Sequence, residues 1–328
     1  MNKKLLLITE FNNKFDFSNE LLMSLKDYFK VEVINTQNFE DRIKKSIFKK
    51  ILNRILLLSL RYFHINLYYF FFGRLNLNKF LNNYIKNNDF DLIILTKCSQ
   101  INPVIFKKNN IKYIYYFFDT FREIKNFSLL NHVKYSHKTF LISKIMVTSL
   151  SKFHNNIYYC PQFINKNWWN SNEQNSVKTI DVLFVGSKFN KRNKVIKHLV
   201  ENGIQIDTYG LGWKNGEIYG QNLLKLFSKS KIVLNFTRDE ISYSLRVYQV
   251  MASNSFLLSS FSKELNNTFV LKEHFDYFDD EHDCLNKIKY YLENEKLRNK
   301  IAFNAMNFVN NKFNHDNIIK NFILGVNG

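Results

Sequence analysis

The chain has 328 residues, of which 45% are hydrophobic and 16% aromatic, so it can bury a large core in more than one domain. Its 9 Gly and 2 Pro are too few for a fibrous or linker-rich chain. The formal net charge of +19 has two interpretations. It favours an anionic partner, such as nucleic acid, an anionic membrane or a phosphorylated substrate, or it reflects only a composition rich in Asn, Lys, Ile and Phe.

The cysteines and the N-terminus indicate a compartment. Cys98, Cys160 and Cys284 are far apart and form no C-x-x-C pair, which favours a reducing cytosol over a disulfide framework. The basic start of the chain is followed by an apolar run that is too short for a signal peptide, and Glu10 ends it. We therefore expect a cytoplasmic protein.

Short apolar strands alternate with amphipathic helices through the N-terminal half. Strands are expected at 4–10, 31–36, 91–98 and 112–120, a helix is expected at 18–29, and the segments 144–149 and 157–163 complete the half. Strands that alternate with helices predict a parallel sheet with right-handed crossovers.

The same pattern is clearer in the C-terminal half. Strands are expected at 181–187, 204–210, 231–237 and 255–260, with helices at 190–203, 220–230 and 243–252 and further helices from about 280 to the end. The polar segment 165–179 separates the halves. The sequence thus predicts an α/β chain of two doubly wound, Rossmann-like domains facing a cleft, 1–165 and 166–328, with ligands at the carboxyl ends of the strands.

Residues 42–74 depart from this pattern. The segment holds many cations and no carboxylate, and Arg61, His64 and Asn66 interrupt its apolar part, so it is too broken to span a bilayer. It is either a basic amphipathic helix in peripheral contact with an anionic membrane or a crossover helix with a solvated Lys face.

Two glycine-containing turns follow predicted strands of the C-terminal half. A missing Cβ lets the backbone approach a ligand, and aromatic residues in the second turn could stack on a nucleobase. Neither turn carries a G-x-G-x-x-G or P-loop motif, so both can also be ordinary turns with nothing bound. The candidate binding residues here are Gly186, Ser187, Tyr209, Gly210, Gly212 and Trp213.

The stretch NFTRDEISYSLRVYQ, residues 235–249, is the most informative one. Arg238 ends a predicted strand and Arg246 begins a predicted helix, where a cation is unfavourable unless an anion is bound. Both side chains could hold one diphosphate. The alternative is that they pair with Asp239 and Glu240.

Further donor-binding candidates surround these arginines. Backbone N–H groups around Ser244 and Leu245 could assist with the diphosphate, and Gln249 lies one helical turn after Arg246, where it could bind a ribose. Asn235, at the end of the preceding predicted strand, completes this set.

Asp119 is the candidate of the N-terminal half. It follows a predicted strand and could orient an acceptor or act as a base, although a lone Asp at such a place is more often an N-cap. Neither zinc-ligand spacing nor an H-E-x-x-H or G-x-S-x-G motif occurs, and we expect no metal and no cofactor.

Several stretches resemble, in their order, the C-terminal domain of GT-B glycosyltransferases. They are DVLFVGS, DTYGLGW, the segment 219–240, LRVYQVMASNSFLLSS and the segment 284–306. The likeness covers about residues 180–323 and is closest to the group named after the spore maturation protein CgeB. The N-terminal half agrees only in pattern, chiefly through YYFFDT and IYYCPQFIN.

The resemblance implies an enzyme that binds a nucleotide diphosphate sugar mainly with its C-terminal domain. Gly186 and Ser187 would lie by the donor. Arg238 and Arg246 would face its phosphates, and the Gln249 position would meet its ribose. Many relatives have Glu at that position and Gly in place of Asn254, so we expect Asn254 in the left-handed conformation that Asn tolerates.

We therefore expect a metal-independent, retaining glycosyl transfer to a glycan or lipid-linked acceptor of the cell surface, with no nucleic acid as partner. Two other hypotheses stay open. One is a non-catalytic basic binder of nucleic acid or anionic membrane, and the other is a different nucleotide-sugar enzyme, such as an epimerase.

Overall fold

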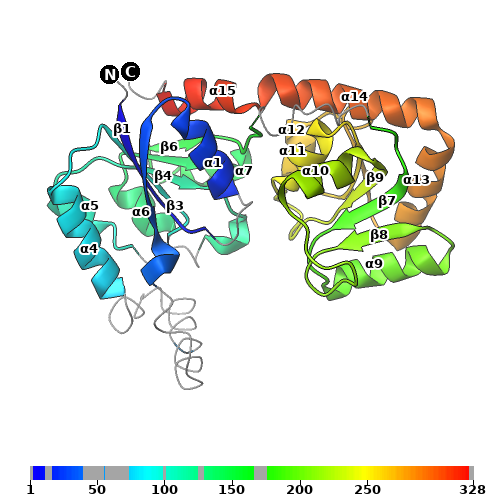
Figure 1. Cartoon of the computed structure of the whole chain (residues 1–328), viewed down its shortest axis with the longest axis horizontal. Helices are drawn as coiled ribbons and strands as arrows, with labels where there is room; N and C mark the ends of the chain where they lie inside the picture. Colours follow the sequence, from blue (N-terminus) through cyan, green and yellow to red (C-terminus); the bar gives the residue numbers. More distant parts are fainter. Residues whose placement is uncertain are drawn as a thin grey trace. The chain divides into compact units, whose positions relative to one another are not determined.

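A computed structural model describes residues 3–11, 17–39, 55, 74–98, 101–124, 129–165 and 176–324. The chain forms two compact units, Met1–Pro161 and Gln162–Gly328, and Figure 1 traces the elements of each along the chain. Apart from residues 55 and 74, the segment 42–74 lies outside the described residues, as does most of the polar segment 165–179. Within the described ranges, no helix combines the length and apolar character that a bilayer span requires.

The N-terminal unit is a six-stranded parallel sheet in the order β2-β1-β3-β4-β5-β6. Because β1 lies between β2 and β3, the strand order reverses there, and the carboxyl ends of β1 and β3 form a topological switch point. The strands are β1 (Lys4–Thr9), β2 (Lys30–Asn35), β3 (Leu92–Thr96), β4 (Ile114–Phe117), β5 (Lys138–Leu141) and β6 (Ile157–Tyr159). The helices are α1 (Phe17–Lys26), η1 (Thr36–Phe39), α4 (Arg74–Lys86), α5 (Val104–Lys108), η2 (Phe121–Glu123), α6 (Leu129–Tyr135) and α7 (Lys144–Leu150).

The C-terminal unit is a five-stranded parallel sheet in the order β11-β10-β9-β7-β8, with its switch point between β7 and β9. Its strands are β7 (Ile180–Val185), β8 (Ile206–Tyr209), β9 (Ser230–Asn235), β10 (Phe256–Ser260) and β11 (Asp276–Phe278). Its helices are α9 (Asn190–Glu201), α10 (Gly220–Ser228), α11 (Arg246–Ala252), α12 (Lys263–Thr268), α13 (Glu281–Glu293), α14 (Glu295–Lys312), α15 (His315–Ile318) and the π-helix η4 (Ile319–Leu324).

The C-terminal sheet is buried on both faces, because successive side chains of a strand point to opposite sides. Along β7, Phe184 packs in a cluster with Ile196 of α9 and Ile288 of α13. The next residue back, Leu183, packs in a different cluster that includes Val247 of α11. The predicted α/β class with two doubly wound sheets is confirmed.

Three local features refine the sequence prediction. Strands β5 and β11 were not predicted, and the segment 144–149, to which no element type was assigned, lies in helix α7. Helix α11 begins at Arg246 and not at 243. Asn254 has a φ of 53°, which is the left-handed conformation expected for it. All three cysteines are buried as free thiols, Cys98 and Cys160 in the N-terminal unit and Cys284 in the C-terminal unit.

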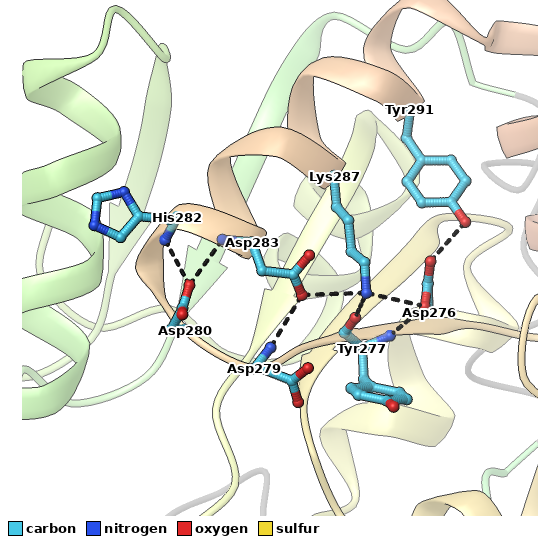
Figure 2. A network of polar contacts seen from close by, with 8 residues as sticks. All are labelled: Asp276, Tyr277, Asp279, Asp280, His282, Asp283, Lys287 and Tyr291. Carbon is cyan, nitrogen blue, oxygen red and sulfur yellow. Dashed lines mark hydrogen bonds and ion pairs between the residues drawn. The ribbon is translucent and has the colours of Figure 1, made fainter.

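A polar network fastens the edge strand β11 to helix α13 (Figure 2). The buried carboxylate of Asp276 accepts hydrogen bonds from the Tyr291 hydroxyl and from the Tyr277 backbone N–H, both at 2.8 Å. The ammonium of Lys287 lies 3.7 Å from Asp276 Oδ1 and 3.2 Å from Asp283 Oδ2. Lys287 also donates to the Tyr277 carbonyl, so one side chain compensates the buried charge and holds the strand end.

Lys287→Met should lower the free energy of unfolding by about 3 kcal/mol, because the buried carboxylate of Asp276 loses its cation. Urea denaturation measures the change. Lys197→Met is the matched control, since its ammonium pairs with Glu201 at 3.5 Å on the surface, where such pairs contribute about 0–1 kcal/mol. Equal losses in the two variants would contradict the stabilising role given to the network.

Candidate functional site

The carboxyl ends of β7 and β9 meet at the switch point of the C-terminal sheet, where doubly wound folds bind ligands. Gly186 follows β7 with a φ of 154°. A Cβ built on it would lie 3.0 Å from Phe184 Cζ, 3.4 Å from Arg192 Nη1 and 3.6 Å from Arg246 Nη1. The absence of a side chain therefore leaves room for two guanidinium groups beside the end of β7.

The turn after β8 is bound tightly to this position. The Gly186 N–H donates to the Tyr209 carbonyl at 2.8 Å, and the Trp213 indole N–H donates to the Gly186 carbonyl at 2.8 Å. A Cβ on Gly210 would lie only 2.4 Å from the Gly186 carbonyl oxygen. The close approach of the two turns thus requires glycine at position 210.

Three arginines gather at this edge of the sheet. Arg192, in the first turn of α9, donates to the Ser187 carbonyl at 2.9 Å and to the Phe236 carbonyl at 3.3 Å. Arg246 is the first residue of α11 and is partly buried, and Arg238 is exposed in the loop after β9. Arg192 was not among the predicted site residues, although its place in the run NKRNK after a strand and glycine was a usable signal.

The electrostatics of this cluster are unbalanced. Burial, together with the positive charges of Arg192 and Arg238, lowers the pKa of Arg246 to about 10. Burial and the charge of Arg238 also lower the pKa of Arg192. At neutral pH Arg246 is still a cation, because its pKa stays well above 7. Like charges held this close favour the binding of an anion among them.

Asp239 and Glu240 are the alternative partners of these arginines, and one carboxylate oxygen of Asp239, Oδ2, is buried without a hydrogen-bond partner among the described residues. Asp239 Oδ1 accepts the backbone N–H groups of Ile241 and Ser242 at 3.0 and 2.7 Å. Glu240 is exposed. Among the described residues, no carboxylate forms an ion pair with Arg192, Arg238 or Arg246. The described contacts therefore do not contain the ion pairs that the alternative required.

The remaining donor-binding candidates lie around the same edge. Gln249 is buried one turn after Arg246 in α11. The side-chain Nδ2 of Asn235 donates to Ser259 Oγ at 2.9 Å. The side-chain Oδ1 of Asn235 is buried without a hydrogen-bond partner among the described residues. Ser244 and Leu245 directly precede α11, whose 7 residues make it a short helix.

The two aromatic candidates have structural contacts that were not foreseen. Tyr209 packs against the core cluster that contains Leu183. Trp213 donates its indole N–H to the backbone, meets the Phe184 ring edge-on and carries the Lys188 ammonium 4.9 Å above its ring. Stacking of a nucleobase on these rings stays a prediction.

Asp119 lies after β4 in the N-terminal unit. Its Oδ2 forms an ion pair with Lys97 Nζ at 2.8 Å, and its Oδ1 accepts the Thr120 backbone N–H at 2.8 Å. The helix that follows, η2, has Thr120 as its N-cap, so Asp119 does not cap it. Within the described ranges, no three His, Cys, Asp or Glu side chains form a metal-binding group.

Comparisons with known proteins agree with this architecture. Residues 191–323, less than half of the chain, match a family model described as glycosyl transferase-like. No match was found among curated proteins. HepE from Anabaena, solved in complex with UDP-glucose, is 12% identical with a TM-score of 0.69, and the match covers 99% of this chain and 100% of HepE.

Two other solved structures share the fold. A glycosyltransferase from Rickettsia africae is 11% identical with a TM-score of 0.66 over 98% of this chain and 97% of its own. A putative UDP-N-acetylglucosamine 2-epimerase from Listeria monocytogenes is 9% identical with a TM-score of 0.57 over 99% and 95%. The fold alone does not separate transferase from epimerase, whereas the family match favours the transferase.

The family match and the fold together confirm the class of enzyme recognised from the sequence, a glycosyltransferase of the GT-B fold. They are compatible with the group named after CgeB but do not single it out. The roles of the individual site residues stay predictions.

Gly210→Ala should destabilise the chain by about 2 kcal/mol more than Gly216→Ala, because crowding a packed position adds to the cost of a positive φ. The control position has a φ of 68° but no atom within 4 Å of its added Cβ. Guanidinium denaturation of both variants gives the difference. If the two alanines cost the same, the close packing of the turns against each other does not constrain position 210.

Proposed function

We propose that this glycosyltransferase takes its glycosyl group from a nucleotide diphosphate sugar and holds the diphosphate with Arg192, Arg238 and Arg246. The observation that carries the proposal is the group of three guanidinium groups at the switch point, none of which pairs with a carboxylate of the described residues. A diphosphate supplies the missing negative charge, and guanidinium groups bind its oxygens in pairs. The UDP-glucose complex of HepE, which has the same fold, supports this choice of ligand class.

In this proposal the arginines act on the leaving group. The bond between the anomeric carbon and the diphosphate oxygen breaks, and its electron pair stays on the diphosphate. The oxygen of an acceptor hydroxyl bonds to the anomeric carbon, and its proton leaves to the departing diphosphate or to solvent. Fixed cations aimed at that developing charge lower the barrier, since they need no reorganisation during the reaction. Gly186 and Gly210 let the two turns and the guanidinium groups pack closely at this edge.

The stereochemical course, the acceptor and the location are inferred from the family resemblance of the sequence. We infer a retaining course from the arrangement of arginines before a helix, and we infer a polysaccharide or glycolipid acceptor bound by the N-terminal unit. Peripheral contact with anionic lipid through residues 42–74 and a cytoplasmic location belong to the same set of inferences.

Arg246→Ala should reduce transfer by about 10- to 150-fold, because one charge-assisted hydrogen bond contributes about 1.5–3 kcal/mol. The loss should fall mainly on kcat if the contact strengthens as the leaving group departs. Arg246→Lys should restore only part of the rate, since an ammonium lacks the bidentate fork. Steady-state kinetics with a radiolabelled nucleotide sugar provides the measurement.

Lys225→Ala is the control for Arg246→Ala, because it removes one positive charge from the exposed face of α10. A basic protein that binds anions through diffuse charge would respond weakly and equally to both substitutions. That outcome would reject the diphosphate site and favour the non-catalytic binder. A thermal-shift series with nucleoside diphosphates tests binding separately, since ligand at about 100 times its Kd stabilises by about 2.7 kcal/mol.

Transfer should persist in excess EDTA, because the three arginines supply the charge that a divalent ion would otherwise bring to the diphosphate. Initial rates before and after chelation give the comparison. If chelation abolishes activity and manganese restores it, the arginines do not supply enough positive charge to stabilise the diphosphate on their own.

A further inference from the structure

The N-terminal sheet has a switch point of its own, at the carboxyl ends of β1 and β3. Buried hydroxyl groups of Thr96, Thr9 and Ser18 tie β3, β1 and α1 together there. Thr96 Oγ1 donates to Thr9 Oγ1 at 2.6 Å, and Thr9 Oγ1 donates to Ser18 Oγ at 3.0 Å. Lys97 is the residue directly after β3, and Glu10 is the residue directly after β1.

Lys97 has an unusual backbone conformation, with a φ of 31° in a residue that is not glycine. Such a conformation costs free energy, and it persists only where surrounding contacts hold it. The contact that holds the side chain is the ion pair with Asp119, in which both side chains are mostly buried, with exposed fractions of 20% and 14%. Lys97 Nζ also lies 5.3 Å from the centre of the Phe118 ring.

The carboxylate of Asp119 can accept further hydrogen bonds in this arrangement. One carboxylate oxygen takes the Lys97 ammonium and the other takes the Thr120 N–H. Each oxygen of a carboxylate can accept a second hydrogen bond. A partly exposed carboxylate that is fixed at both oxygens is suited to receive a hydroxyl in a defined direction.

We propose that Lys97 is a positioning residue that holds Asp119 where it accepts a hydrogen bond from the hydroxyl of a sugar acceptor. This inference rests on the proposed function, since it names the acceptor-side contact of the same transfer. The Lys97–Asp119 pair itself carries no net charge, which suits a neutral polyhydroxy ligand. Asp119 touches the acceptor, and Lys97 acts only through Asp119.

The test measures transfer of radiolabel from UDP-glucose, UDP-galactose and UDP-N-acetylglucosamine into membranes of the source organism, with the full-length chain. Lys97→Met should raise the apparent KM for the membrane acceptor or lower kcat by about tenfold or more, with the KM for the donor unchanged. Lys97→Arg should restore most of the rate, because it keeps the cation. Asp119→Asn together with Lys97→Met should be no worse than the poorer single variant, since the two residues act as a unit.

Lys4→Met is the matched control. It removes an ion pair of 3.1 Å between Lys4 and Glu32, whose side chains are each 31% exposed. This pair joins neighbouring strands of the same sheet, but Lys4 lies at the amino end of β1, away from the proposed site. A merely structural Lys97–Asp119 pair would lower the thermal midpoint as Lys4→Met does and leave both the acceptor KM and kcat unchanged, which would overturn the inference.

The two proposals fail in different ways. If the parent chain transfers label and Arg246→Ala loses it while Lys97→Met keeps the parent's kinetics, the positioning role is wrong and the donor site stands. If the parent transfers no label and no nucleoside diphosphate stabilises it in the thermal-shift series, the proposed function is overturned, and the inference falls with it.

Discussion

The C-terminal unit is organised around three positive charges that its own described side chains do not neutralise. Arg192 shows how this is sustained, because its guanidinium donates to carbonyl groups on both sides of the switch point, Ser187 after β7 and Phe236 after β9. The same side chain thus ties the two strand ends together and adds to their positive potential. The glycines at 186 and 210 follow from this arrangement, since any larger residue would enter the space that the guanidinium groups and the adjacent turn occupy.

The two sheets place opposite kinds of chemistry at equivalent positions. At the N-terminal switch point, the charge of Lys97 is matched by Asp119. At the C-terminal switch point, the cations stand without a matching carboxylate among the described residues. A neutral polyhydroxy compound suits the first edge and a diphosphate suits the second, which is the division of labour expected of a transferase with a sugar acceptor and a nucleotide-sugar donor.

The periodicity of apolar residues was sufficient to predict both sheets, because strands buried on two faces are continuous apolar runs that polar turns interrupt. It failed at β5 and β11, whose sequences, KTFL and DYF, are too short to stand out. Arg238 and Arg246 could be identified from their positions beside a strand end and a helix start. The position of Arg192 after a strand and glycine was a signal that was not used, whereas its bonds to the Ser187 and Phe236 carbonyl groups depend on distances that no spacing rule encodes.

Trp213 illustrates the same limit. An aromatic ring in a glycine-rich turn indicates a flat binding surface, yet its indole N–H is bound to the Gly186 carbonyl and its ring lies beside Phe184. The tight apposition of two turns from different strands decides this, and that is a tertiary constraint. Asp119 was likewise found by its place after β4, whereas its partner Lys97, 22 positions earlier in the sequence, could be recognised only once β3 and β4 were seen as neighbours.

Because the cysteines are divided between the two units, their reactivity can report local unfolding of each unit. Burial raises the pKa of Cys160 to about 12 and also raises the pKa of Cys284, so neither thiol offers an appreciable thiolate while its unit is folded. Alkylating reagents can modify such thiols only as fast as the surrounding structure opens. Since Cys98 and Cys160 belong to one unit and Cys284 to the other, the pattern of modified thiols distinguishes local opening of either Rossmann-like unit from cooperative unfolding of the whole chain.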